Sequence, residues 1–216
     1  MSKKYSLLPY DSMLVNGHTL YRIIALKRLN RHVNAGDVGG YVEEYHNLSQ
    51  SGTCWVYNDA MVYGKAKVSG NARIQNSAQV YDKARVSGYA RIENSAKVYG
   101  HARVRDYARV CNHARVYDKA RISDNAQVWM TGSVFGKARV SDYSEIYGDA
   151  QVTGNVRVRW HTDVYGHAHL SGNLRIGKQA RSMCITKSMS TVNKLGNFPR
   201  KPWFNIGELA AQTLRE

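Results

Sequence analysis

The chain has 216 residues, and its 31 Lys and Arg residues against 16 Asp and Glu residues leave a formal net charge of +15. This length is typical of one or two domains, and the positive surplus favours acidic partners. No stretch is apolar for long enough to span a membrane, and the N-terminal region lacks the apolar core of a secretory signal, so we expect a soluble, cytoplasmic protein. Cys54, Cys111 and Cys184 are far apart and form no CxxC pair, which argues against disulfides and against a metal site.

Residues 1–59 are predicted to form an N-terminal β cap. Met13 to Leu29 contains alternating apolar positions around Asn16-Gly17, a pair typical of a type I′ hairpin. A hairpin here would cover the first turn of the following domain, because an open β end can template aggregation. We expect Gly39-Gly40 and Asn47 to serve turns that lead into that domain.

Residues 60–181 carry a six-residue repeat. From Val62 to Ile176 every sixth residue is Val, Ile or Leu, and Ala follows four positions later in most hexads. Between them stands Gly, Asp or Asn, the residues that best tolerate the positive φ of a tight corner. The repeating unit is therefore V-x-[GDN]-x-A-x.

This repeat predicts the fold. A helix with 3.6 residues per turn cannot keep a strict six-residue repeat on one side, and the chain lacks the turn signals of antiparallel hairpins. Coiling in one direction pairs each strand with the strand eighteen residues later, about 4.8 Å away. We predict an all-β, single-stranded, three-sided parallel β-helix with about seven turns of eighteen residues. Residues 182–216 lose the repeat and are predicted to form an irregular tail or cap, with a short helix from Ile206 to Leu214.

Two segments resemble known families. The hexads resemble the signature of left-handed β-helix proteins with hexapeptide repeats, a superfamily dominated by trimeric acyltransferases. The stretch GDVGGYVEEYHNLSQSGTCWVYNDA, from Gly36 to Ala60, together with GHTLYR from Gly17 to Arg22, resembles YdcK-like proteins and a group of phage and prophage proteins. The resemblance covers roughly residues 14–181. It implies a left-handed coil and a protein of phage or bacterial type, and the acetyltransferase label of YdcK-like proteins implies, without establishing, acyl transfer from acetyl-CoA.

The outward positions repeat every eighteen residues, although the core requires only the hexad. Residues 61–181 hold 20 basic and 9 acidic residues, so most of the net charge lies in this domain. Three columns of like residues stand two positions apart. They are Lys67, Arg85, Arg103, Arg121, Arg139, Arg157 and Arg175; Lys65, Lys83, His101, Lys119 and Lys137; and Tyr63, Tyr81, Tyr99, Tyr117 and Phe135.

The basic columns predict a polyanion-binding surface. Like charges about 4.8 Å apart repel by about 1 kcal/mol in water, so a long ladder is unfavourable unless something negative lies along it. A nucleic-acid backbone is the simplest ligand, with the tyrosines as stacking surfaces. The alternative is a solvated surface copied by tandem duplication, in which long stems shield the sheet and corner acids such as Asp82, Asp118 and Asp142 neutralise part of the charge.

Acyl transfer is a second alternative. In the resembling acyltransferases a histidine typically deprotonates the acceptor, and a general base of that kind must be a neutral imidazole held near the acceptor. The candidates are His113 and His167, with His101, His161 and His169 also in the repeats, and Asp149 stands one turn before His167. In the resembling acyltransferases the site lies between subunits of a trimer and is often completed by an inserted loop, which the unbroken hexads lack. Acetyl-CoA would be the cofactor in this case, and no cofactor is expected otherwise.

A third alternative is a structural or interaction module, such as a homotrimer or a protein that docks on a host protein. Rigid flat faces suit this role. The column with Trp129, Tyr147 and Tyr165 is a candidate contact patch. The sequence contains no Walker phosphate loop, HExxH motif or GxSxG elbow.

Overall fold

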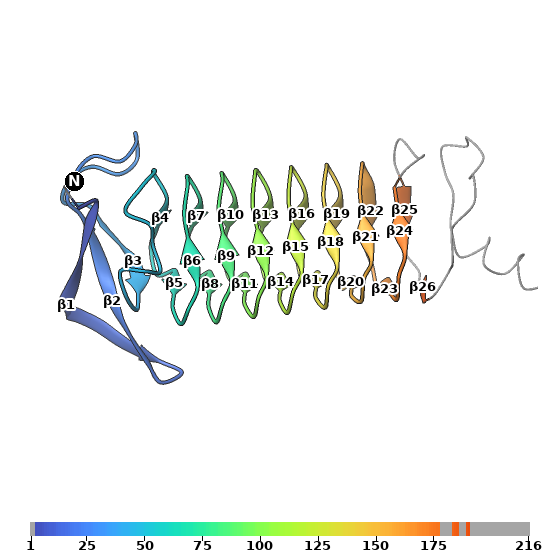
Figure 1. Ribbon diagram of the computed structural model, residues 1–216, viewed down its shortest axis with the longest axis horizontal. Coiled ribbons are helices and arrows are strands. Elements are labelled where there is room, and N and C mark those ends of the chain that lie inside the picture. The colour runs from blue at the N-terminus through green and yellow to red at the C-terminus, as the bar shows by residue number, and fades with distance from the viewer. Residues whose placement is uncertain (1–2, 178–182, 186–188, 191–216) are drawn as a thin grey trace, which may run out of the picture.

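The protein is a rod of stacked β coils with a β-hairpin at one end (Figure 1). The computed structural model describes residues 3–177, 183–185 and 189–190. All regular elements in these residues are strands, which confirms the predicted all-β parallel solenoid.

Each coil contributes one short strand to each of three parallel sheets. We name them the hairpin sheet, the arginine sheet and the third sheet. The hairpin sheet contains β5 (Met61–Val62), β8 (Gln79–Val80), β11 (Lys97–Val98), β14 (Arg115–Val116), β17 (Ser133–Val134), β20 (Gln151–Val152), β23 (His169–Ser171) and β26 (Met189–Ser190). The arginine sheet contains β6 (Lys67–Val68), β9 (Arg85–Val86), β12 (Arg103–Val104), β15 (Arg121–Ile122), β18 (Arg139–Val140), β21 (Arg157–Val158) and β24 (Arg175–Ile176). The third sheet contains β4 (Trp55–Val56), β7 (Arg73–Ile74), β10 (Arg91–Ile92), β13 (Arg109–Val110), β16 (Gln127–Val128), β19 (Glu145–Ile146), β22 (Thr162–Val164) and β25 (Met183–Ile185).

The eighteen-residue register stacks equivalent residues directly on one another. Arg103, for example, pairs with Arg85 on one side and with Arg121 on the other. The aliphatic residue of every described hexad and the alanine after it are buried, so the interior is a continuous column of Val, Ile and Ala. The outward residues therefore form straight columns along the rod.

The corners between sheets use the left-handed conformation that the Gly, Asp and Asn residues predicted. Two corner residues depart from this chemistry, because Met130 (φ 55°) and Trp160 (φ 65°) also adopt it. For an ordinary L-residue that conformation costs about 1–2 kcal/mol. These two corners are therefore locally strained.

The solenoid has about eight turns, because the segment before the hexads supplies an additional one. Leu48 bridges to Val68 of the arginine sheet, and β4 begins the third sheet, which has eight strands. At the other end, β25 and β26 extend the ladders past residue 181. The predicted helix from Ile206 to Leu214 lies outside the described residues, and the left-handed sense of the coil stays a prediction.

The predicted hairpin is present. Strands β1 (Tyr5–Val15) and β2 (His18–Ala25) pair antiparallel around Asn16 and Gly17, which both have positive φ. Strand β3 (Val38–Val42) pairs antiparallel with β2 and parallel with β5, so the hairpin continues the hairpin sheet. Tyr5 packs edge-on against Trp55, with ring centroids 6.3 Å apart, and both side chains are buried. The core of the rod thus extends into the hairpin.

Gly39 and Gly40 do not form the predicted turn, because both lie inside β3. They permit a close approach instead. A Cβ atom on Gly39 would lie 2.7 Å from the Ile23 side chain and 2.8 Å from the Trp55 ring, so only glycine fits between hairpin and coil. Asn47 does lie in a turn, where its buried side chain donates to the carbonyls of Gly64 and Ala66.

Candidate functional site

The predicted basic column is a continuous row on the arginine sheet. We call Lys67, Arg85, Arg103, Arg121, Arg139, Arg157 and Arg175 the arginine column. Serine stands two positions after the column residue in four coils, and its short side chain leaves the long cations accessible. None of the seven side chains, all within the described residues, takes part in an ion pair or a hydrogen bond to a side chain. The column is therefore an array of uncompensated cations.

Repulsion from its neighbours in the column affects the guanidinium group of Arg157. The charges of Arg175 and Arg139 lower the pKa of Arg157 below its ordinary value. A lowered pKa means that the charged form of the guanidinium is destabilised. An acidic neighbour would instead raise the pKa.

The corner acids do not neutralise the arginine column through direct pairing. Asp82 and Asp118 each accept a hydrogen bond, 3.1 Å long, from the backbone N–H of the glycine eighteen residues later. Asp124 and Asp142 accept in the same way from the next coil, at 3.3 Å and 3.0 Å. These carboxylates thus stabilise the stacked corners. Among the described arginines of the hexad coils, Arg105, which lies outside the column, pairs with a corner acid, Asp106, at 3.6 Å.

The predicted lysines adjoin the arginine column. Lys65, Lys83, Lys119 and Lys137, with His101, project from the corner between the hairpin sheet and the arginine sheet. We call them the lysine corner. All five are exposed. The structure therefore brings the two predicted basic columns together along one edge of the rod.

The predicted tyrosine column lies on the other side of that corner, at the edge of the hairpin sheet. Tyr63, Tyr81, Tyr99, Tyr117 and Phe135 form a ladder of parallel rings whose successive centroids are 4.8–5.1 Å apart. Burial in this ladder raises the pKa of Tyr81 to about 12. Because each internal ring face already contacts another ring, this tyrosine ladder offers few faces for a ligand.

The structure reveals exposed aromatic residues that the sequence reading missed. Tyr89, Tyr107, Tyr143 and Trp160 each expose more than half of their surface, at the corner between the arginine sheet and the third sheet. Tyr89 stacks on Tyr107, and Tyr143 stacks on His161, at 5.0 Å and 4.8 Å. We call these five residues the aromatic corner. The sequence pattern that could have predicted the aromatic corner is a Tyr four positions after Arg85, Arg103 and Arg139.

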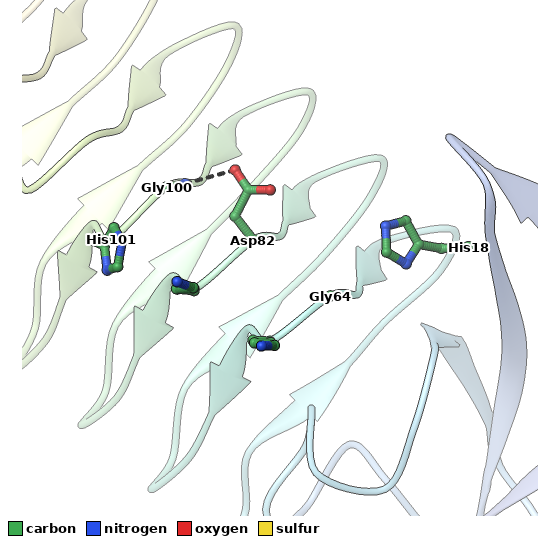
Figure 2. A pocket seen from close by; sticks show the side chains of 7 residues that line it. His18, Gly64, Asp82, Gly100 and His101 are labelled. Atoms are coloured by element: carbon green, nitrogen blue, oxygen red, sulfur yellow. Dashed lines mark hydrogen bonds between the residues drawn. The ribbon is translucent and has the colours of Figure 1, made fainter.

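A groove lies where the hairpin tip meets the lysine corner (Figure 2). It has a volume of about 410 Å³ and is open to solvent. It is lined by His18 of β2 and by the corner residues of three successive coils. These residues are Gly64, Lys65, Asp82, Lys83, Gly100 and His101.

The hairpin wall of this groove is held in place by polar contacts. The Nδ1 atom of His18 is 2.8 Å from Oε1 of Glu43, and Oε2 of Glu43 accepts a hydrogen bond from Gly64 N–H at 2.6 Å. The His18 ring lies 5.3 Å from the Tyr63 ring, and Asn16 donates to the Tyr63 hydroxyl at 3.3 Å. His18 was not among the predicted catalytic histidines, since its partner Glu43 is 25 residues away in sequence.

The predicted catalytic candidates lie elsewhere. His113 and His167 share the corner between the third sheet and the hairpin sheet, three coils apart. His167 is 3.4 Å from Asp149, as its spacing suggested, but both side chains are largely exposed. Within the described residues, no group of three or more His, Cys, Asp or Glu side chains is placed to hold a metal ion.

The candidate contact patch on the third sheet is a second aromatic stack. Tyr147 lies between Trp129 and Tyr165, with centroids 4.6 Å and 5.1 Å away. Trp129 also donates to Glu145 at 3.3 Å. The side chains of this column thus stabilise one another on the surface of the third sheet.

Comparisons with known proteins agree with the architecture. No curated protein matches the chain. The described residues contain no helix that could cross a membrane. A family model described as YdcK Beta solenoid repeat matches residues 66–82, one coil of the rod. The coils that follow repeat the matched coil in register, so the chain is similar to this family in its repeat and in its parallel β-solenoid fold.

Proposed function

We propose that the arginine sheet binds an extended polyanion, and that single-stranded nucleic acid is its preferred ligand. The observation that carries this proposal is the arginine column, seven cations in register that have no acidic partner in the described part of the chain. Adjacent members stand about 4.8 Å apart, the spacing of strands in a sheet. A chain of phosphates along the column would relieve their repulsion and release condensed counterions, which is the main source of affinity for nucleic acids.

Tandem duplication alone does not account for the arginine column. Duplication copies all three faces equally, yet the equivalent column of the third sheet passes from Arg73, Arg91 and Arg109 to Gln127, Glu145 and Asp163. The equivalent column of the hairpin sheet is likewise mixed. A basic residue persists through seven coils on the arginine sheet alone, which supports a role for that face.

The aromatic corner favours a single strand over a duplex. A single strand exposes its bases, and stacking of a base on an aromatic side chain contributes about 1–3 kcal/mol. Tyr107 and Tyr143 stand two coils apart, with the smaller Asn125 between them in the column. A base inserted over Asn125 would lie about 4.8 Å from each ring, close to the ring spacing within the aromatic corner. A duplex would keep its bases paired and use only the cations.

The test is binding of labelled single-stranded DNA, single-stranded RNA, duplex DNA and polyphosphate across a salt series. The variant Arg103→Glu, Arg121→Glu, Arg139→Glu removes the centre of the arginine column. The matched control Arg73→Glu, Arg91→Glu, Arg115→Glu makes the same change of net charge on the other two faces. We expect the wild type to show a log–log salt slope of roughly −3 to −6 with single strands. The column variant should lose binding and the control should retain most of it.

The outcomes distinguish the alternatives. Equal loss in both triple variants would mean that net charge, and not the arginine column, attracts the polymer. Equal affinity for duplex and single strands would reject the role of the aromatic corner. No binding at about 50 mM salt, where phosphate contacts are strong, would reject the polyanion proposal.

Acyl transfer is a second candidate, and the His18–Glu43 pair favours it. A histidine oriented by a carboxylate next to a groove is the arrangement of a general base. The test is the melting temperature of the wild type and of His18→Gln with acetyl-CoA, since a ligand that binds only the folded state stabilises it. An unchanged melting temperature at saturating acetyl-CoA would reject this candidate.

A further inference from the structure

The groove at the hairpin tip differs from the rest of the lysine corner because cationic and imidazole groups surround it from two directions. Along the corner the lysines project into open solvent. At the tip, His18 of the hairpin lines the groove together with Lys65, Lys83 and His101 of the coils. Figure 2 shows His18 at one end of the groove and His101 at the other. A ligand here would be contacted from two elements that are distant in sequence.

The walls of the groove are already in place before any ligand binds. Glu43 bridges the His18 ring and the Gly64 N–H, which joins the hairpin to the first corner of the hexad coils. The Asn16 contact to Tyr63 holds the turn of the hairpin on the end of the tyrosine ladder. Binding to a preorganised site avoids the loss of entropy that ordering a loop requires.

The charge of the groove favours an anion. Neither Lys65 nor Lys83 forms an ion pair or a side-chain hydrogen bond among the described residues. One oxygen of Asp82, the single acid in the lining, is used by the Gly100 N–H at 3.1 Å. The same corner recurs two coils later as Asp118, Lys119 and Gly136, with the same 3.1 Å bond but outside the groove. The hairpin is what converts one corner of this kind into a site.

We propose that this groove binds a phosphate monoester, either as inorganic phosphate or as the terminal phosphate of a nucleotide. A phosphate monoester carries nearly two negative charges and three strong acceptor oxygens. The ammonium groups of Lys65 and Lys83 and the imidazole N–H of His101 provide matching donors. The volume of about 410 Å³ is within the range of small-molecule sites and leaves room for a group attached to the phosphate. The site does not depend on the polymer-binding proposal.

The experiment is calorimetric titration of the full chain with inorganic phosphate, adenosine monophosphate and adenosine. Lys83→Gln should weaken phosphate binding about tenfold, the effect of losing one hydrogen bond to a charged group. Lys119→Gln is the matched control, since it removes the equivalent lysine outside the groove, and should leave binding unchanged. Asp82→Asn should tighten binding, because it removes the one acid and keeps an acceptor for the Gly100 N–H.

Each outcome decides a point. Tighter binding of adenosine monophosphate than of inorganic phosphate identifies a nucleotide terminus as the source, and the reverse identifies free phosphate. No heat of binding with either phosphate, equal loss in the Lys83 and Lys119 variants, or equal binding of adenosine would overturn the proposal. Melting curves of each variant show that it remains folded. The Arg103, Arg121, Arg139 triple variant should bind phosphate normally, so failure of polymer binding and failure of this site are separate results.

Discussion

The arginine column and the tyrosine ladder have the same eighteen-residue period and opposite energetics. Stacked tyrosines contact one another at 4.8–5.1 Å and bury apolar surface, so each added ring stabilises its neighbours. Stacked arginines repel, and the pKa of Arg157 is lowered by its neighbours in the column. The comparison shows that repetition alone does not indicate function. A column that the fold itself stabilises is explained without a ligand, whereas the uncompensated charge of the arginine column is what supports the polyanion proposal.

The largest expected effect is a loss of affinity when the arginine column is interrupted. Replacing Arg103, Arg121 and Arg139 by Glu should lower the affinity for single-stranded DNA by at least about 100-fold, because three phosphate contacts are lost and three repulsions added. The melting temperature should change little, because these side chains form no ion pair with any described residue. Anisotropy titration and thermal melting measure the two quantities. A variant that unfolds would contradict the claim that the column contributes nothing to the fold.

A substitution in the tyrosine ladder should have the opposite result, a loss of stability without a loss of affinity. Tyr99→Ala should lower the free energy of unfolding by about 2 kcal/mol, less than the ~3–5 kcal/mol for removing a fully buried aromatic, since Tyr99 is only partly buried. Affinity for single-stranded DNA should stay within about twofold of the wild type, because the ladder lies around the corner from the arginine sheet. Denaturant melts and anisotropy test this. A large loss of affinity would mean that the ladder contacts the ligand.

Alkaline pH should weaken the tyrosine ladder selectively. Burial raises the pKa of Tyr81 from 10.0 to about 12. A phenol with a raised folded-state pKa contributes its full stability below pH 10, and that contribution is lost as the pH rises towards 12. Stability should therefore fall over this window, and less so in a Tyr81→Phe variant. Denaturant melts at stepped pH measure the effect, and an equal fall in the Phe variant would exclude Tyr81 as its source.

The smallest expected effect is the gain in stability when a strained corner residue is replaced by glycine. Two such residues, one in the aromatic corner and one outside it, separate backbone strain from ligand binding. Trp160→Gly and Met130→Gly should each stabilise the protein by about 1 kcal/mol, because glycine adopts positive φ without a steric cost. Trp160 belongs to the aromatic corner, so its replacement should also weaken binding of single strands. Met130 lies at a different corner and should leave binding unchanged. Equal affinities of the two variants would remove Trp160 from the interface.

The sequence by itself determined the repetitive part of the protein. A strict hexad with Val or Ile, a corner residue and Ala permits one way of burying every aliphatic side chain, so the sheets, the register and the arginine column follow from spacing alone. The hairpin at Asn16-Gly17 followed from local turn chemistry.

The tertiary structure decided everything that joins residues distant in sequence or lies at a corner. The sequence placed the tyrosine, lysine and arginine columns two positions apart, but this spacing did not show where the chain turns. The turn lies between Tyr63 and Lys67, and it places the tyrosine ladder and the arginine column on different faces. The close approach at Gly39, the His18–Glu43 pair and the groove all depend on how the hairpin docks on the first coils. That docking is set by side-chain packing between segments without a shared repeat, and no periodic pattern encodes it.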